Sequence, residues 1–368
     1  MTKPVGETKL QACLGPRLRG DDGGESGALR AASVDAAGKV VNETELIQNY
    51  LAPLAAEFPG AFGLTDDCGL IGADASHDLV VSTDPIIAGV HFFASDCAGD
   101  IAWKALAVNV SDLIAKGAAP LAYTMAIAFP QAPDRSWMAA FSEGLAAAQL
   151  AFGCHLIGGD TDRTPGPLSI SITVFGQVPC GQMVRRSSAR QGDHVFVTGT
   201  LGDSALGLEI HSHAGRWDSH LSTGEMSFLV GRYLRPEPRI AMVPLVRGYA
   251  SAALDISDGL LKDLGRLVAP VPARIEFKFD KLPLSQPARR VLAADPQRAA
   301  SVISGGDDYE VLFCVPPERL KDFKQALRAV SVQVSEIGVL EAGSGVIVRN
   351  DAGHVIDPGS AGYDHFSA

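Results

Sequence analysis

The chain has 368 residues, which is long enough for two domains of ordinary size. Hydrophobic residues make up 46% and charged residues 20% of the sequence, so we expect a packed globular core. The 31 Lys and Arg residues against 42 Asp and Glu residues give a net charge of −11, which argues against nonspecific nucleic-acid binding because that needs a basic surface. No apolar run approaches the roughly 20 residues of a membrane span, so no membrane partner is expected.

The N-terminal segment and the cysteines also indicate where the protein is found. Residues 1–42 are rich in Gly, Arg and Asp and lack the apolar stretch of a secretory signal, so we expect a disordered extension there. The six cysteines are scattered without a CxxC pair, which favours reduced thiols in a cytoplasmic protein over a disulfide framework or a zinc site.

Apolar periodicity predicts an amphipathic helix over 43–58 and then a loop that carries Asp66 and Asp67. Strands and helices alternate after that loop. We expect strands over 79–84, 121–129, 168–174, 194–198 and 252–256, and helices over 100–116, 137–152, from 204 onward and over 258–264. This order predicts an α/β or α+β protein. The polar, basic stretch 181–192 is interpreted as a domain junction, which gives domains over 43–180 and 181–368.

Six clusters of acidic residues accompany Gly, Ser or Thr, mostly where the backbone is expected to turn. They are Thr65-Asp66-Asp67, Ser82-Thr83-Asp84, Ser111-Asp112, Gly158-Gly159-Asp160, Asp255-Ile256-Ser257-Asp258 and Gly305-Gly306-Asp307-Asp308. Carboxylates gathered in one place repel each other unless cations lie between them. Hard ions such as Mg²⁺ prefer oxygen ligands and usually bind together with phosphate. The clusters therefore predict a site for several metal ions and a nucleotide.

Each cluster alone also has a simpler explanation. Ser257 can be an N-cap with Asp258 favoured by the helix dipole, and the Thr83-Asp84 and Gly158–Asp160 stretches can be plain turns. Asp112 is harder to explain in this way, because an acid within a largely apolar helix needs a partner. The sequence contains no phosphate-loop, dinucleotide-binding or protein-kinase signature, so any nucleotide site must be of another kind.

Ten segments together resemble the thiamine-monophosphate kinases, a family in the superfamily of aminoimidazole ribonucleotide synthetase and selenophosphate synthetase. The segments are TDDCGLIG (65–72), VSTDPIIAGVHF (81–92), KALAVNVSDLIAKGAAP (104–120), LIGGDTDR (156–163), RSSARQGD (186–193), VTGTLGDSALGL (197–208), LRPEPRI (234–240), LDISDGLLKDLG (254–265), SGGDDYEVLF (304–313) and GYDHF (362–366). They follow the family order from about residue 43 to the end. The AGVHF, SGGDDYE and GYDHF stretches favour this branch over its relatives.

The resemblance implies a two-domain aminoimidazole ribonucleotide synthetase-like fold, in which each domain has a mixed sheet with helices. It implies ATP-dependent phosphorylation of thiamine monophosphate to thiamine diphosphate, assisted by several Mg²⁺ ions, in a homodimer joined through the N-terminal domains. The implied metal ligands are Asp67, Ser82, Thr83, Asp84, Asp112, Asp160, Asp255 and Asp258. The implied ATP contacts are Gly159, Asp160, Arg186 and Ser257. The implied substrate contacts are His91, Asp307 and Tyr363. No general base is assigned.

The chain departs from the family pattern at a few positions. Asp307 stands where the family usually has Glu, so that substrate contact is shortened by one methylene or moves to Asp308. Leu64-Thr65 replaces the usual Ile-Gly pair, and Pro85 stands where Thr is common. Two alternatives remain open. One is another ATP-using synthetase of the superfamily, such as a selenophosphate or aminoimidazole ribonucleotide synthetase; the other is a metal- or nucleotide-binding regulatory module without turnover.

Overall fold

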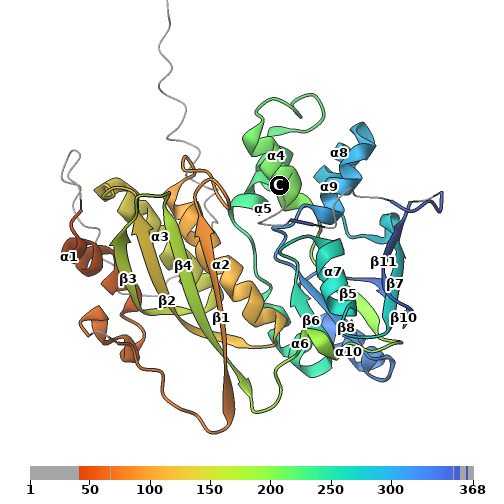
Figure 1. Cartoon of the computed structure of the whole chain (residues 1–368), viewed down its shortest axis with the longest axis horizontal. Helices are drawn as coiled ribbons and strands as arrows, with labels where there is room; N and C mark the ends of the chain where they lie inside the picture. The colour runs from red at the N-terminus through yellow and green to blue at the C-terminus, as the bar shows by residue number, and fades with distance from the viewer. Residues whose placement is uncertain (1–40, 67, 351, 357–361, 364–368) are drawn as a thin grey trace, which may run out of the picture.

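The computed structural model describes residues 41–66, 68–350, 352–356 and 362–363 (Figure 1). Residues 1–40 of the expected extension and the predicted ligand Asp67 lie outside the described residues. The expected boundary at residue 42 is two residues too late, because Val41 is buried and Asn42 caps α1. The N-terminal part starts with α1 (Glu43–Leu46) and three further short helical segments. These are a π-helix (Ile47–Leu51) and two 3₁₀ segments (Ala52–Ala55 and Pro59–Leu64).

A four-stranded sheet with two long helices follows. Its elements are β1 (His77–Ile87), α2 (Ala98–Ala115), β2 (Ala119–Phe129), α3 (Arg135–Phe152), β3 (His155–Arg163) and β4 (Ser169–Pro179). The strand order is β1-β4-β2-β3, so β1 and β3 are the edge strands. Only β2 and β3 pair in parallel; the other neighbours are antiparallel, which makes the sheet mixed.

The second half contains two sheets and seven α-helices among the described residues. Its elements are β5 (His194–Thr198), α4 (Asp203–Ser212), α5 (Thr223–Leu234), α6 (Val243–Tyr249), β6 (Ala252–Asp255), α7 (Leu260–Val268), β7 (Ala273–Lys278), α8 (Gln286–Ala294), α9 (Ala299–Ser304), β8 (Val311–Val315), α10 (Leu320–Ala326), β9 (Val334–Val339), β10 (Glu341–Ala342) and β11 (Gly345–Arg349). One sheet has the order β6-β8-β5-β9 and the other the order β10-β7-β11. The expected mixture of helices and sheets is confirmed.

Helix α2 lies between the two halves of the molecule (Figure 1). It packs against β1, β2 and β4 on one side and against β6 and β8 on the other. Fourteen of its 18 residues are buried, and one hydrophobic cluster contains Ile172 of β4, Leu113 of α2 and Phe313 of β8. Because water reaches little of this helix, its polar residues Lys104, Asn109 and Ser111 are buried as well.

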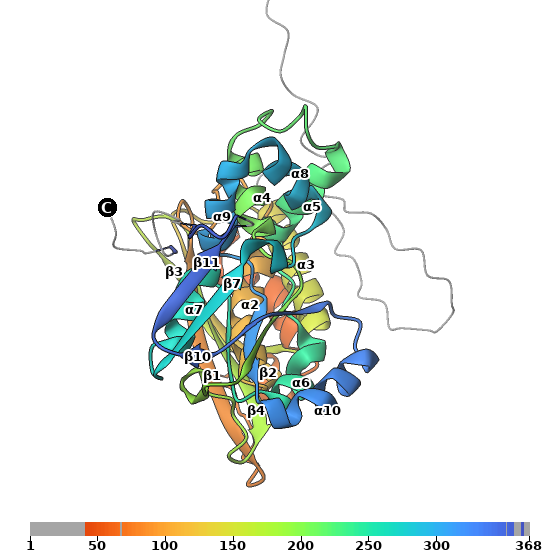
Figure 2. The ribbon, with the colours of Figure 1, turned by 90° about the vertical axis from the view of Figure 1, so that its right-hand side faces the viewer.

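The two faces of the β1–β4 sheet differ. Val80 and Ile86 of β1 are buried on the face that meets α2, whereas Leu79 and Val81 are 50% and 53% exposed on the opposite face. We call this second face the outer face. Figure 2 views the molecule from the right-hand side of Figure 1, with β7 and β11 of the second half in front of the sheet. Apolar side chains from residues 55–64 and Ile71 cover one end of the outer face, in a small cluster that includes Ala122. The rest of the outer face along β1 presents apolar side chains to solvent.

Three local expectations are corrected. The helix expected over 43–58 is α-helical only in its first turn, and Pro53, which has no N–H to donate, stands in the 3₁₀ segment that follows. Ser257 is not a helix N-cap, because α7 begins at Leu260 with Gly259 in the capping position. The Gly158–Asp160 stretch, which could have been a plain turn, lies inside β3, and this strand continues to Arg163.

The cysteines need a further correction. Cys97 is disulfide-bonded, so the expectation of reduced thiols throughout is wrong at this position. The free thiols among the described residues are those of Cys68, Cys154, Cys180 and Cys314. One bond at the start of α2 is still far from a disulfide framework.

Close contact between α2 and α3 gives a test of the core. A Cβ atom at Gly144 would lie 2.3 Å from the carbonyl oxygen of Gly99, whereas a Cβ atom at Gly231 in α5 would meet nothing within 4 Å. We expect Gly144→Ala to lower the free energy of unfolding by about 1–3 kcal/mol, because backbone atoms must move apart. Gly231→Ala, the matched control, should raise it by about 0.5–1 kcal/mol. Urea unfolding of both variants measures the difference, and equal stabilities would contradict the contact.

Candidate active site

A cleft with a volume of about 1100 Å³ opens between the two halves of the chain. Its walls come from the end of β1, from α2, from the 3₁₀ turn Arg186–Ser188, and from the loops that follow β6 and precede β8. Ten of the predicted site residues line it or contact its lining. Those on the wall are Asp84, His91, Asp112, Arg186, Asp255, Ser257, Asp258, Asp307 and Tyr363. The tenth, Ser82, is hydrogen-bonded to one of them.

Polar residues of α2 hold the end of β1 in place. The Ser82 hydroxyl donates to the Asp112 carboxylate at 2.5 Å. The Asn109 side chain accepts from the Asp84 backbone N–H at 2.8 Å and donates to the Asp84 carbonyl at 3.3 Å. Three predicted ligands (Ser82, Asp84 and Asp112) therefore meet at one place, although 30 residues separate the first from the last.

The last two acidic clusters also lie side by side. Backbone N–H groups of Asp307 and Tyr309 donate to the carbonyls of Ser257 and Ile256, each at 2.8 Å. Asp307 and Tyr309 have left-handed backbones, with φ of +61° and +48°. Such conformations cost free energy in residues other than glycine and often occur at functional sites.

Asp263 is a residue that the sequence did not single out, and it organises the same loop. Its carboxylate accepts the backbone N–H groups of Ser257 and Asp258 at 3.1 and 3.0 Å, from a fully buried position. Burial raises the pKa of the Asp263 carboxyl to about 6, and the Arg266 guanidinium opposes that shift. Asp263 therefore fixes the backbone of the loop that leads into α7.

The electrostatics of the cleft are those of crowded carboxylates. Burial raises the pKa of the Asp255 carboxyl well above its usual range, and the neighbouring Asp112 and Asp263 raise it further. Burial likewise raises the pKa of the Tyr309 hydroxyl, and Asp307, Asp255 and Asp84 add to that shift. These carboxylates lie close enough to repel one another, so a cation between them would be stabilised.

Oxygen donors of this kind fit Mg²⁺. The oxygen donors are spread around the cleft. Within the part of the chain that the structure describes, which leaves out Asp67, no three carboxylate, imidazole or thiol groups lie close enough together to hold one metal ion. Asp258 is at present paired with Arg266 at 2.5 Å and with Lys262 at 3.2 Å. A metal ion at Asp258 would have to compete with these two cations.

The C-terminal segment docks on the same loop. The Tyr363 N–H donates to the Asp258 carbonyl at 3.0 Å, and the Lys262 ammonium donates to the Tyr363 carbonyl. A Cβ atom at Gly362 would lie 2.5 Å from the Asp258 carbonyl oxygen, so the close approach requires glycine. This contact places the half-exposed Tyr363 ring on the cleft wall.

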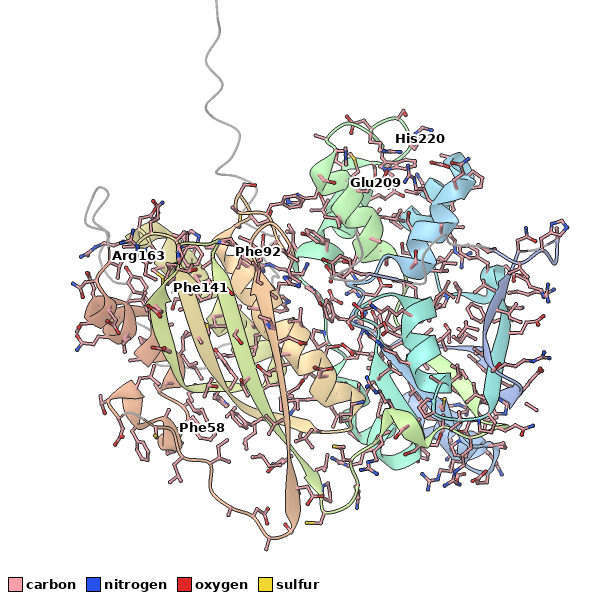
Figure 3. All side chains as sticks on the ribbon, viewed as in Figure 1. Phe58, Phe92, Phe141, Arg163, Glu209 and His220 are labelled. Carbon is pink, nitrogen blue, oxygen red and sulfur yellow. The ribbon has the colours of Figure 1, made fainter. Side chains whose placement is uncertain are left out.

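Gly159 and Asp160 lie away from the cleft, on the edge strand farthest from β1. In the cross-strand register, Asp160 lies beside Ala126, Ala126 beside Ser171, and Ser171 beside Pro85 of β1. Three strand spacings separate Asp160 from β1, which is about 14 Å. Figure 3 shows the same relation, with Arg163 at the end of β3 and Phe92 just after β1 at one end of the sheet.

The register of the strands also determines to which face of the sheet each side chain points. Partners in register point to the same face of a sheet, so Asp160 points to the outer face together with exposed Ala126, while Asp84 points toward α2. Thr83 lies on the outer face too, where its hydroxyl donates to the Ile172 carbonyl and accepts from Thr173, each at 3.0 Å. Within one chain, the structure does not bring Asp160 and Thr83 to the acidic residues around α2.

A buried ion-pair network supports the loop that carries Asp307. The fully buried Glu310 carboxylate accepts from Arg232 at 2.7 Å, from Arg239 at 2.8 Å and from the Thr198 hydroxyl at 2.6 Å. A Cβ atom at Gly199 would lie 2.0 Å from that carboxylate. The sequence signals for this network are Arg239 in LRPEPRI, Arg232 two residues before that motif, and Gly199 in VTGTLGD, and sequence reasoning did not use them.

Comparison with known proteins identifies the class. The profile of the AIR synthase related protein N-terminal domain matches residues 65–178. The hydrogenase maturation protein HypE in complex with ATP has the same fold, with a TM-score of 0.68 at 17% identity over 85% of this chain and 93% of that one. The fold is therefore that of an AIR synthase-related protein.

Similar proteins narrow the class to a family. Thiamine-monophosphate kinase of Caulobacter vibrioides is 36% identical over 326 residues, 88% of this chain and 90% of that protein. The Escherichia coli K12 enzyme is 38% identical over 83% of this chain and 92% of its own length. The Stenotrophomonas maltophilia thiamine-monophosphate kinase structure has a TM-score of 0.75 at 36% identity, covering 84% of this chain and 97% of that one.

A further structure, AaThiL complexed with AMPPCP and TMP, has a TM-score of 0.70 at 32% identity, covering 84% of this chain and 98% of that one. The chain belongs to the thiamine-monophosphate kinase family, and it is a kinase. None of the helices in the described residues could cross a membrane.

Proposed function

We propose that this enzyme transfers the γ-phosphoryl group of ATP to thiamine monophosphate, which gives ADP and thiamine diphosphate. One observation carries the proposal: a single cleft gathers acidic residues for metal ions (Asp84, Asp112, Asp255), a cation for phosphate (Arg186) and the predicted substrate contacts. A relative of the same family in complex with the ATP analogue AMPPCP and TMP supports it. We place the enzyme in the cytoplasm, where the four free thiols among the described residues would stay reduced.

The chemistry requires two anions to approach each other. Asp84, Asp112, Asp255, Asp258 and Ser82 would hold Mg²⁺, with Asp67 and Thr83 as further proposed ligands. The bound ions supply charge neutralisation and alignment of the two phosphates. Arg186 would bind the ATP phosphates, since a guanidinium forms strong hydrogen bonds to phosphate oxygens. The backbone beside Ser257 would approach the nucleotide at the same place.

No residue needs to remove a proton. The attacking oxygen belongs to a phosphate that is already ionised at neutral pH, so the protein's task is to bind, orient and neutralise. At the other end of the cleft, His91 and Asp307 would bind polar groups of thiamine, and the Tyr363 ring would stack on one of its aromatic rings.

The direct test is an assay with ATP, Mg²⁺ and thiamine monophosphate, followed by chromatography of the products. Equal amounts of ADP and thiamine diphosphate support the proposal. Release of ADP without thiamine diphosphate, or ATP consumption only with an amide or selenide substrate, would favour a superfamily relative instead. No turnover with any of these would favour a regulatory module.

Asp112→Asn should lower kcat at least about 100-fold without unfolding the protein, because it keeps the side-chain shape and removes a metal-binding charge. The hydrogen bond from Ser82 can still form to the amide oxygen. Asp322→Asn, at an exposed position of α10, is the matched control and should leave kcat unchanged. Near-normal turnover of Asp112→Asn with an unchanged Mg²⁺ dependence would remove Asp112 from the site.

We further propose a homodimer in which the outer faces of two sheets pack together. Exposed Leu79 and Val81 supply apolar surface for that contact. Sheets stack about 10 Å apart, and a two-fold axis along the strands would put β3 of one chain opposite β1 of its partner. Asp160 and Gly159 would then reach the partner's nucleotide site, which explains why they lie about 14 Å from β1 in their own chain.

Complementation tests this arrangement. Asp112→Asn and Asp160→Asn homodimers should each be inactive, whereas a heterodimer purified with two different tags should regain about half of the wild-type turnover. One of its two sites would then contain only native residues. If each site belongs to one chain, the heterodimer stays inactive.

Tyr363→Ala should raise the KM for thiamine monophosphate by about 2- to 10-fold and leave the KM for ATP nearly unchanged, since aromatic stacking is worth about 0.5–1.5 kcal/mol. Tyr363→Phe keeps the ring and should behave like the wild type. Steady-state kinetics with each substrate varied in turn decides the matter. If Phe and Ala have the same effect, the hydroxyl is the important group and stacking is not the explanation.

A further inference from the structure

Lys104 is a buried lysine at the centre of the molecule. It lies on α2, its side chain is only 2% exposed, and its ammonium donates to the Asp307 carboxylate at 2.9 Å and to the His91 carbonyl at 3.0 Å. The same ammonium lies 3.9 Å from the centre of the Tyr233 ring. A buried charge is retained only when it is paired and hydrogen-bonded, and this one has partners on three different segments.

Each carboxylate oxygen of Asp307 accepts a hydrogen bond from a buried side chain. Lys104 donates to Oδ2 at 2.9 Å, and the Tyr309 hydroxyl donates to Oδ1 at 3.2 Å. The Asp307 N–H is bonded to the Ser257 carbonyl at 2.8 Å. Backbone and side chain are therefore both fixed, and each carboxylate oxygen keeps a lone pair that a ligand in the cleft can use.

His91 is held from its main chain as well as from its ring. Its carbonyl accepts from Lys104 and, at 3.4 Å, from the Tyr233 hydroxyl. Its ring Nδ1 accepts the Ile87 backbone N–H at 3.0 Å, so Nε2 carries the proton of the neutral imidazole. One lysine thus connects the two residues that we assign to the thiamine end of the substrate.

We propose that Lys104 is a positioning residue for the thiamine subsite: it holds the Asp307 carboxylate and the His91 main chain at a fixed separation and takes no part in binding ATP. This inference rests on the proposed function.

The test compares Lys104→Met, Asp307→Asn and the double variant with the wild type. Calorimetry measures the Kd of thiamine monophosphate in the presence of AMPPCP and Mg²⁺, steady-state kinetics gives both KM values, and thermal unfolding monitors the fold. Lys324→Met is the control, since that exposed lysine also pairs with a carboxylate, at 2.9 Å from Glu336, and lies 6.0 Å from the Phe196 ring centre. It should change neither constant.

Lys104→Met should raise the Kd and KM for thiamine monophosphate about 10- to 100-fold while the KM for ATP changes less than about twofold, because an unpaired Asp307 loses its orientation. In the Asp307→Asn background, Lys104→Met should raise the Kd for thiamine monophosphate far less, since the Asp307 carboxylate is already absent. Parallel increases in both KM values, or the same loss in both backgrounds, would overturn the proposal in favour of a purely structural lysine.

Two outcomes need separate treatment. If Lys104→Met does not fold, the double variant carries the test: a thiamine monophosphate affinity equal to that of Asp307→Asn supports positioning, and a further large loss overturns it. If the wild type itself neither binds nor phosphorylates thiamine monophosphate, the proposed function has failed and the subsite assignment with it. That failure is seen in the unmodified enzyme and is distinct from any effect confined to the variants.

Discussion

The burial of α2 between two sheets is the constraint on which the site depends. A helix that contacts β1, β2 and β4 on one side and β6 and β8 on the other leaves most of its polar side chains little access to bulk water. Each must find a partner within the protein. Asn109 is hydrogen-bonded to the backbone of Asp84, Asp112 to Ser82, and Lys104 to Asp307. The hydrogen bonds that satisfy the polar side chains of α2 therefore also fix the residues that line the cleft.

Acidic residues around that helix come together at a cost in free energy. Burial and mutual repulsion disfavour the charged form of Asp255, yet the loops that carry these groups are held by backbone hydrogen bonds and by the Glu310 network. The rigid loops therefore keep the carboxylates close together in spite of their repulsion, and a bound cation would relieve that repulsion. Such an arrangement favours ligand binding over maximal stability of the empty protein.

Sequence reasoning found the strand ends and acidic loops because these follow from local periodicity and turn residues, as the match at His194–Thr198 illustrates. It could not find the face on which Asp160 points, because strand order and register depend on contacts between distant segments. It also missed Lys104 and Asp263. A lysine in an apolar helix and an aspartate in the first turn of α7 look ordinary until their partners, 203 and 5 to 6 residues away, are known.

The left-handed backbones of Gly306, Asp307 and Tyr309 have a consequence for the order in which the chain folds. Two of these residues are not glycines, and each such conformation costs about 1–3 kcal/mol unless its surroundings enforce it. Here the surroundings are the carbonyls of Ile256 and Ser257, which accept these backbone N–H groups and belong to the loop that follows β6. We therefore expect this segment to be among the last to order during refolding.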